Sequence, residues 1–505
     1  GTLPRLYFES LPPKIKRQPS HVKMKTSTSN SHLKLNKSKD SAKSNSKRTS
    51  DYPPSKPMHR ASEPSYLSDE APMQNYRGLL NLGLIILVIS NFRILLTTTR
   101  EYGFVLTHLH PNKARSIAIY TWEDILNFPL LYGMGILNVF VVYAYLIELF
   151  TSRKMWNESF GVFLHLINTN SALCIPTAIV WYQIQSPITG ALLVMTATVL
   201  WMKLISYAHA NADYRRHPER SNHDSTDFIT NKDEYSKALQ YPQNITLSNI
   251  YYFWFAPTLT YQIVFPRLVR RNKLRILTLG LRLFLTNVLI IFLIAQIIRP
   301  TLSSLVQYLE EGGNEYSIHI FFEYMLKLGI ASTYIWLLVF YGFFHVFLNF
   351  LAEALKFGDR VFYKDWWNSS NLSSYWRLWN LPVHYWLVRH LYFPCVRHGI
   401  SKNGATFLVF FFSAVLHELL ISIPFHMIKP YSFLGMMSQI PLIGLTKYLD
   451  RTKPGSSIGN IIFWLSFCIV GQPMAVIMYT IDHWKQTSRT GYEGSFDAGN
   501  TNDEL

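Results

Sequence analysis

Charged residues are scarce in this sequence of 505 residues. Asp, Glu, Lys and Arg make up 16% of it, whereas 49% is hydrophobic and 15% is aromatic. Ordinary soluble domains carry about a quarter charged residues. The formal net charge is nevertheless +17, so the charges must be crowded into limited stretches. This composition excludes an ordinary soluble globular protein and leaves much of the chain available for lipid.

Cysteine is nearly absent as well, because the chain has only Cys174, Cys395 and Cys468. Three thiols inside or beside apolar runs exclude a disulfide-stapled secreted domain and are typical of reduced, buried cysteines. The 33 Phe, 30 Tyr and 13 Trp, which lie in long apolar blocks, exclude collagen-like and fully disordered chains.

Several motifs of well-known enzyme classes are missing. The sequence has no P-loop and no Gly-x-Gly-x-x-Gly, which argues against an ATP-driven pump and a dinucleotide enzyme. The letters HELLI at 417–421 lack the second His of a zincin helix. His384, His390 and His398 lack the i, i+4 spacing of helical metal ligands. We therefore expect neither a metal site nor a resident cofactor.

Apolar stretches of about twenty residues recur from Gly78 to Ile481. A helix of that length crosses a hydrocarbon core of about 30 Å, and a chain in lipid must satisfy its backbone hydrogen bonds within each helix. The sequence therefore predicts an all-α, multi-pass transmembrane protein with about nine spans. The predicted spans are 78–98, 127–150, 158–182, 187–208, 277–298, 318–352, 404–426, 431–446 and 458–481.

Charges between the spans predict the orientation, because cytosolic loops carry an excess of Lys and Arg. Residues 209–276, 353–403 and 447–456 hold more basic than acidic residues, whereas 299–317 and the tail from Asp482 are more acidic. We therefore expect a cytosolic N-terminus and a luminal C-terminus.

The two ends of the chain differ from the apolar middle. Residues 11–60 hold thirteen Lys or Arg and two acidic residues in a Ser-rich setting. Tyr52 is the one Phe, Tyr or Trp there, so aromatic residues do not alternate with the basic ones. A solvated tail is therefore favoured over a nucleic-acid arm, and contact with anionic lipid is an alternative. The predicted domains are a disordered basic cytosolic tail (1–75), a membrane-embedded domain (76–485) and an acidic luminal tail (486–505).

An ionisable pair lies in the middle of the seventh predicted span. His417 is thirteen residues beyond Gly404, or about 20 Å along a helix. Ionisable groups at such depth are costly in lipid and by default mark a polar cavity. Adjacent helical residues point about 100° apart, so Glu418 is expected to brace a neighbouring helix. Gln439 and Gln472 lie at a similar depth on the next two spans, where they either converge on one intramembrane chamber or join the helices.

The segment between the sixth and seventh spans is rich in aromatic residues. It reads VFYKDWWNSSNLSSYWRLWNLPVHYWLVRHLYFP over 361–394. Aromatic side chains with polar edges, next to Arg377, Arg389 and Arg397, suit an element at the headgroup level that meets an anionic amphiphile. An interfacial helix that only anchors the protein is the alternative.

Residues FYKDWWN at 362–368, the intramembrane pair His417-Glu418 and the many spans resemble the membrane-bound O-acyltransferase superfamily, in its sterol and diacylglycerol branch. The sequences RLWNLPVHYWLVRHLY (377–392), SQIPL (438–442) and GQP (471–473) are most similar to the diacylglycerol enzymes of that branch. The resemblance covers roughly 75–485.

This resemblance implies an endoplasmic-reticulum enzyme that moves a fatty acyl group from acyl-CoA, a co-substrate, to the free hydroxyl of diacylglycerol. It also implies a homodimer or homotetramer, with His417 as the catalytic residue and Lys402 near the phosphates of CoA. The other expected substrate-binding residues are Asn380, Gln439, Gln472, Trp379, His384, Ser413 and Glu418. The family motif comprises Phe362, Tyr363, Asp365, Trp366, Trp367 and Asn368.

A neutral imidazole in a water-poor pocket can accept a proton from a hydroxyl, so His417 is expected to act as general base. Gln472 or Asn380 is expected to donate a hydrogen bond to the developing oxyanion. No Ser or Cys is visibly paired with His417, which favours direct transfer, and Ser413 is the residue to test as an acyl carrier. A sterol or long-chain-alcohol acyltransferase and a multi-pass lipid transporter without chemistry are the alternatives.

Overall fold

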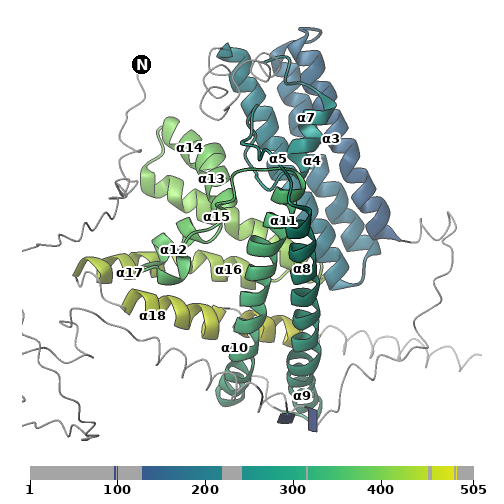
Figure 1. The fold of residues 1–505 in the computed structure, drawn as a ribbon. Coiled ribbons are helices and arrows are strands. Elements are labelled where there is room, and N and C mark those ends of the chain that lie inside the picture. Colours follow the sequence, from purple (N-terminus) through teal and green to yellow (C-terminus); the bar gives the residue numbers. More distant parts are fainter. Residues whose placement is uncertain are drawn as a thin grey trace, which may run out of the picture. The chain divides into compact units, whose positions relative to one another are not determined.

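The computed structural model of the chain is drawn in Figure 1. The basic tail 1–75, most of the first predicted span, Gln472 and the acidic tail 486–505 lie outside the residues that it describes. The described residues are 92, 96, 97, 99, 100, 128–218, 241–313, 317–452, 458–471, 473–482 and 485. They contain no β-strand, and Arg267 and Phe357 form an isolated antiparallel bridge.

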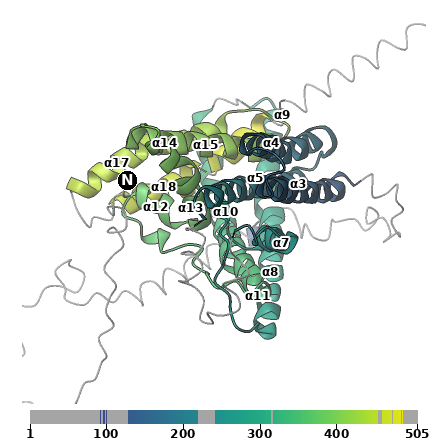
Figure 2. The same ribbon diagram turned by 90° about the horizontal axis from the view of Figure 1, so that it is seen from above.

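Three long helices pack together at the start of the described part: α3 (Pro129–Ser152), α4 (Glu158–Gln183) and α5 (Pro187–Arg216). Figures 1 and 2 show them side by side. A proline starts α3 and α5 at a position where its missing N–H costs no helical hydrogen bond. Leu137 and Leu193 are at most 1% exposed within this bundle. Each helix is long and apolar enough to cross a membrane, so the second, third and fourth predicted spans are confirmed.

Two longer helical segments follow, Lys273–Glu310 with 38 residues and Ile318–Ala354 with 37. At 1.5 Å per residue each is about 55 Å long, well beyond a hydrocarbon core of about 30 Å, so each must tilt or continue past the lipid. The fifth span is thus longer than the predicted 277–298. The first segment comprises α8 (Lys273–Leu293), a π-helical turn (Ile294–Ile298) and α9 (Arg299–Glu310), and the second comprises α10 (Ile318–Phe340), a π-helical stretch (Tyr341–Phe347) and α11 (Leu348–Ala354).

The remaining helices are mostly short. In Figure 1 the axes of α15 to α18 are roughly transverse to those of α8 and α10. Two of these elements, Lys402–Ser422 and Ile458–Asp482, are long and apolar enough to be spans, which makes seven candidate spans among the described residues. The helices are α12 (Leu372–Leu378), α13 (Leu381–Leu387), α14 (Phe393–Arg397), α15 (Lys402–Ser422), α16 (Tyr431–Met437), α17 (Gln439–Thr452) and α18 (Ile458–Leu465).

The prediction of one continuous span over 431–446 is wrong. The structure divides this stretch into α16 and α17, with Ser438 between them. Pro441 supplies the physical reason, because a proline lacks the N–H that would bond to the carbonyl of Met437 and its ring clashes with that carbonyl. Figure 1 shows the two short helices in succession, so the chain runs in two pieces where a single helix was expected.

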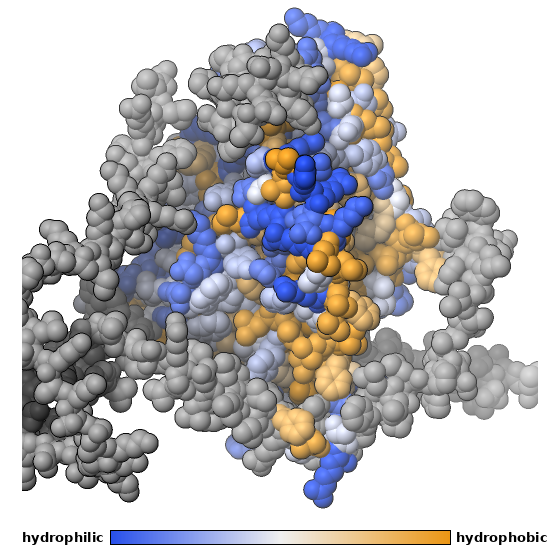
Figure 3. Space-filling model, viewed as in Figure 1, coloured by the Kyte–Doolittle hydropathy of each residue, from blue (hydrophilic) through white to orange (hydrophobic). Residues whose placement is uncertain are grey.

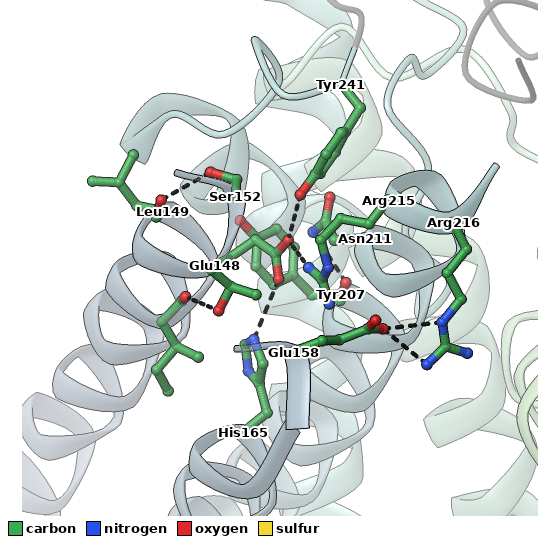
Figure 4. A network of polar contacts seen from close by, with 12 residues as sticks. Glu148, Leu149, Ser152, Glu158, His165, Tyr207, Asn211, Arg215, Arg216 and Tyr241 are labelled. Atoms are coloured by element: carbon green, nitrogen blue, oxygen red, sulfur yellow. Dashed lines mark hydrogen bonds and ion pairs between the residues drawn. The ribbon is translucent and has the colours of Figure 1, made fainter. Parts of the chain in front are cut away.

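Buried polar side chains connect the ends of α3, α4 and α5 (Figure 4). Glu148, near the end of α3, is 0% exposed, and its carboxylate forms an ion pair with Arg215 of α5. The second carboxylate oxygen lies 3.4 Å from Nε2 of His165 on α4. The hydroxyl of Tyr241 donates to the first oxygen at 3.2 Å. One carboxylate therefore ties three helices to the segment that leads into α7.

Lys203 fixes α7 (Leu247–Phe255) against α5. Its ammonium group is buried and donates to the carbonyl oxygens of Phe253 and Trp254, both at 2.8 Å, and of Ala256 at 2.7 Å. These carbonyls belong to the end of α7, where the last turn has no helical partners and the helix dipole favours a cation. The lysine thus serves as the C-terminal cap of a short helix.

Candidate active site

Helix α15 carries His417 and has clear signals at both ends. The side chain of Ser401 caps the start, where its Oγ accepts from the N–H of Gly404 at 3.1 Å. The apolar run that follows favours a helix in lipid, and the helix ends at Ser422, two residues before Pro424. Because α15 runs obliquely to the long helices in Figure 1, the count of about 20 Å along its axis overstates the depth of His417.

The imidazole of His417 is oriented by its own helix. Its Nδ1 lies 2.7 Å from the carbonyl oxygen of Ser413, one turn earlier. A carbonyl oxygen can only accept, so Nδ1 carries the hydrogen, and the neutral ring has its lone pair on Nε2. The hydroxyl of Ser413 is 3.4 Å from the same Nδ1. The contact therefore leaves Nε2 as the nitrogen that can take a proton.

The surroundings of His417 are apolar. Ala414 and Phe410 lie three and seven residues earlier, on the same face of α15, and both are buried, at 0% and 9% exposure. His417 itself is partly buried. The cluster on this face joins α15 to α12, α16 and α17 and consists of Phe410, Ala414 and Met436 with Trp376, Phe433, Met437, Ile440 and Ile443.

Glu418 points to other partners than His417. One carboxylate oxygen accepts from the backbone N–H of Phe433 at 2.9 Å, and the other accepts from the hydroxyl of Tyr479 at 3.2 Å and from the hydroxyl of Ser422. Phe433 belongs to α16, and Tyr479 lies in the last described helical turns. The carboxylate thus braces the helices on either side of α15, which holds the backbone that carries His417.

The family motif forms a packing centre. Trp366 is 1% exposed, and Phe362 is 3% exposed. The hydroxyl of Tyr363 lies 2.8 Å from Nδ1 of His345 on the neighbouring long helix. Ring contacts of Trp366 reach two spans and α12, through Trp336, Phe340, Tyr375, Phe463 and Trp464. The aromatic segment is therefore folded against the spans.

The other motif residues lie at the edge of this centre. Trp367 is 43% exposed, and Asp365 and Asn368 are exposed too. The N–H of Asn368 donates to the carbonyl oxygen of Asp365 at 3.0 Å, which closes a single 3₁₀ turn. This turn presents the outer edge of the motif to its surroundings.

Asn380 starts the helix that follows the motif. Its Oδ1 accepts from the N–H of Val383 at 3.2 Å and so caps α13. This cap uses the oxygen and leaves the amide hydrogens for another acceptor. Trp379, next to it, stacks with Tyr375 at a ring separation of 6.1 Å. On α13, burial and the positive charge of Arg377 lower the pKa of His384.

The remaining predicted site residues lie at the ends of α15 and α17. Lys402 is exposed at the start of α15. Gln439 is the first residue of α17, and its Nε2 donates to the carbonyl oxygen of Gly435 at 3.3 Å across the break after α16. The structure thus brings α15, α17 and α12, which ends next to Trp379, into contact around one apolar cluster, whereas Lys402 stays at the surface and Gln472 is not described.

Comparison with known sequences decides the family. The sequence profile of the membrane-bound O-acyltransferase family matches residues 125–481, which include every candidate site residue. The chain belongs to the membrane-bound O-acyltransferase family. Several named members of this family align with most of this chain.

Two plant relatives are both named diacylglycerol O-acyltransferase 1. The relative from Corylus americana is 38% identical over 440 residues, which is 87% of this chain and 78% of the relative. The relative from Arabidopsis thaliana is 36% identical over 439 residues, 87% of this chain and 79% of the relative. A relative of the same name from Dictyostelium discoideum is 36% identical over 416 residues, 82% of this chain and 64% of the relative.

In this membrane-bound O-acyltransferase, sequence reasoning missed the contacts that dock α13 and the π-helical turn after it (Val388–Tyr392) onto α5. His390 Nε2 lies 2.9 Å from Oγ of Ser206, and its Nδ1 lies 3.2 Å from Nδ1 of His209. Trp386, one turn earlier, donates to the carbonyl oxygen of Met202 at 2.8 Å. A usable signal existed, because Trp386 and His390 are spaced i and i+4 and Ser206 and His209 are spaced i and i+3, so each pair lies on one helix face.

Proposed function

We propose that this protein catalyses the transfer of a fatty acyl group from acyl-CoA to diacylglycerol, with triacylglycerol and CoA as products. Membership of the membrane-bound O-acyltransferase family and the diacylglycerol acyltransferase names of relatives that match more than four fifths of the chain support this activity. The single observation that carries the mechanism is the contact of His417 Nδ1 with the carbonyl of Ser413, because it leaves Nε2 as a base among apolar side chains.

In the proposed reaction, the free hydroxyl of diacylglycerol gives its proton to Nε2 of His417 as its oxygen attacks the thioester carbon. The C–S bond then breaks, the new ester remains on the glycerol, and the CoA thiolate takes the proton back from the imidazolium. A hydrogen bond to the oxyanion from Asn380 or Gln472 lowers the barrier. Asn380 can serve because its cap to Val383 uses only the amide oxygen.

Direct transfer without an acyl-enzyme is part of this proposal. A serine nucleophile would need a basic nitrogen next to its hydroxyl. The imidazole nitrogen that lies 3.4 Å from the hydroxyl of Ser413 is Nδ1 of His417, which already donates its hydrogen to a carbonyl. Ser413→Ala is therefore expected to keep most of the activity, and no label from acyl-CoA should remain on the purified protein.

We also propose that the protein resides in the endoplasmic-reticulum membrane, with its N-terminus in the cytosol and its C-terminus in the lumen. The distribution of Lys and Arg among the connecting segments supports this orientation. It places Lys402 at the cytosolic side, where the charged head of acyl-CoA would remain while its acyl chain enters the membrane. A homodimer or homotetramer is proposed from the family resemblance, and the mass of the purified particle tests it.

The decisive experiment supplies purified protein with labelled oleoyl-CoA and, separately, diacylglycerol, a sterol or a long-chain alcohol. We expect CoA release and labelled ester with diacylglycerol. His417→Gln should lower turnover by at least about 100-fold, the usual contribution of a general base, without loss of thermal stability. His398→Gln is the matched control, because the Nδ1 of His398 also lies 2.8 Å from a carbonyl one turn earlier but on an exposed surface.

Other outcomes contradict the proposal in different ways. Preference for a sterol or a long-chain alcohol would replace the acceptor and keep the chemistry. Near-normal turnover of the folded His417→Gln variant would remove His417 from the mechanism. Absence of CoA release with every acceptor would favour the transporter.

A further inference from the structure

A dense group of cations lies at the start of α8, two just before the helix and two in its first turn. Arg270, Arg271, Lys273 and Arg275 are all exposed, and we call these four residues the basic cluster. Figure 3 shows hydrophilic side chains gathered where α8 begins and α11 ends, with hydrophobic surface along α8 beyond them. The first turn of α8 contains no acidic residue. Cations at the N-terminus of a helix oppose the helix dipole, so this arrangement is unfavourable without an anionic partner.

The nearest acidic side chain does not neutralise the basic cluster. Glu353 at the end of α11 is 2% exposed, and one of its oxygens lies 2.6 Å from Nη2 of Arg360. The Nε of Arg275 lies 3.9 Å from the same oxygen, and the other oxygen accepts from the backbone N–H of Asn272 at 2.8 Å. Within the part of the chain that the structure describes, the other three cations of the cluster form no ion pair.

The basic cluster is held on an ordered scaffold. The N–H of Leu268 donates to the carbonyl of Lys356 at 2.8 Å, and the N–H of Gly358 donates to the carbonyl of Pro266 at 2.7 Å. Oδ1 of Asn272 accepts from the N–H of Arg275 at 3.1 Å and caps α8. The cations therefore need little further ordering before they bind an anion.

Apolar residues on α8 place the basic cluster at the level of lipid headgroups. Leu274, Leu277 and Leu281 are 72%, 69% and 56% exposed, and Phe284 is 63% exposed. They recur at i, i+3, i+7 and i+10 and so form an outward stripe of a helix that is apolar enough to span a membrane. Cations at the start of such a stripe meet the boundary between hydrocarbon and water, where phospholipid phosphates lie.

We propose that the basic cluster binds the headgroup of an anionic phospholipid of the surrounding bilayer. The acyl chains of that lipid would lie along the apolar stripe of α8, and its phosphate and net negative charge would pair with Arg270, Arg271 and Lys273. This site is separate from the proposed acyl-CoA site, whose cation, Lys402, starts α15. Each basic residue near an anionic lipid surface contributes about fivefold to affinity, so three together contribute roughly 100-fold.

The test uses the full chain in a neutral detergent and the anisotropy of fluorescent phosphatidylserine. The triple variant Arg270→Gln, Arg271→Gln, Lys273→Gln should bind this probe roughly 100-fold more weakly than the unmodified protein. The matched control removes three exposed cations outside the basic cluster, with Arg153→Gln, Lys447→Gln and Arg451→Gln, and should stay within about twofold of the unmodified protein. Fluorescent phosphatidylcholine reports binding that does not depend on charge.

Competition separates the sources of phosphate. Inorganic phosphate and CoA should displace the lipid only weakly, because neither provides chains for the stripe of α8. If CoA displaces it as well as unlabelled phosphatidylserine does, the cluster belongs to acyl-CoA and the lipid proposal fails, whether or not the enzyme activity is confirmed. Equal binding of the triple variant and the unmodified protein, or of the two fluorescent lipids, also overturns it.

A measurement on the unmodified protein covers the case in which the triple variant does not fold. Raising the salt concentration from about 0.05 M to about 0.5 M shortens the screening length severalfold and should weaken phosphatidylserine binding at least tenfold. Binding that does not change with salt would contradict the proposal.

Discussion

Removing one partner of the buried ion pair between Glu148 and Arg215 should lower the free energy of unfolding more than removing both. Breaking a buried pair leaves an uncompensated charge and typically costs about 3–5 kcal/mol, whereas replacing both partners by apolar residues is often close to neutral. The side chain of Glu148 is 0% exposed and that of Arg215 is 14% exposed, so neither charge can turn to water. The pair therefore falls in this class.

The magnitudes follow from the contacts. Glu148→Leu leaves the charge of Arg215 without its partner and should lower the free energy of unfolding by about 4 kcal/mol. Arg215→Met leaves the charge of Glu148 unpaired in the same way and should have a similar effect. The double variant loses both charges together, and what remains are the hydroxyl of Tyr241 and the imidazole of His165 without their carboxylate partner, which costs about 2 kcal/mol. We therefore expect a coupling energy of more than about 3 kcal/mol in the double-mutant cycle.

Thermal unfolding in detergent is the assay, with each single variant expected to lower Tm by at least about 4 °C and the double variant by about half as much or less. The neighbouring pair Arg216 and Glu158, 2.8 Å apart but 62% and 42% exposed, is the matched control. Its cycle should couple by no more than about 1 kcal/mol. Additive losses at Glu148 and Arg215, with no more coupling than in the control, would refute the reasoning.

Two further predictions concern groups that join the helices. Burial, with the neighbouring charges of Arg389 and His209, lowers the pKa of His390 from 6.5 to about 3. The unfolded chain then binds one more proton than the folded protein between these values, so stability falls as pH drops from 6.5 toward 3, by up to about 1.4 kcal/mol per pH unit. His390→Asn should reduce the proton uptake on unfolding by one, so Tm should fall less steeply as the pH drops over this range. An unchanged slope would contradict the assignment. Lys203→Met leaves three carbonyls at the end of α7 unpaired, so we expect a net loss of about 2–4 kcal/mol and faster amide exchange in α7; unaltered exchange there would show that the cap is unnecessary.

Much of the fold could be predicted because lipid imposes a simple requirement. A segment that crosses hydrocarbon must be helical, long and apolar, and seven of the eight predicted spans after the first correspond to such helices in the described residues. The exception, 431–446, shows the limit of this approach. Its hydropathy was high enough for a span, but Pro441 and the polar end of α17 interrupt the helix, and hydropathy averaged over a window does not register one missing hydrogen bond.

The candidate site was predictable in its residue types and less so in its contacts. The depth argument singled out His417 because ionisable groups are costly in lipid. Sequence could not show that Nδ1 of this ring is held by the carbonyl of Ser413, or that the amide oxygen of Asn380 is occupied by a helix cap. It also missed the pairing of His390 with Ser206, whose partners are separated by 184 residues.

The amino-acid sequence by itself determined that this chain is helical, multi-pass and equipped with a histidine inside an apolar helix, because these properties depend on local composition and on the length of each apolar run. Only the tertiary structure decided which ring nitrogen can act as a base, which charges are neutralised inside the protein and which face outward at the start of α8. The first outcome depends on how the side chain of His417 is turned toward the carbonyl of Ser413 on its own helix. The others depend on distances between residues far apart in the chain, and hydropathy and local spacing carry no record of such distances.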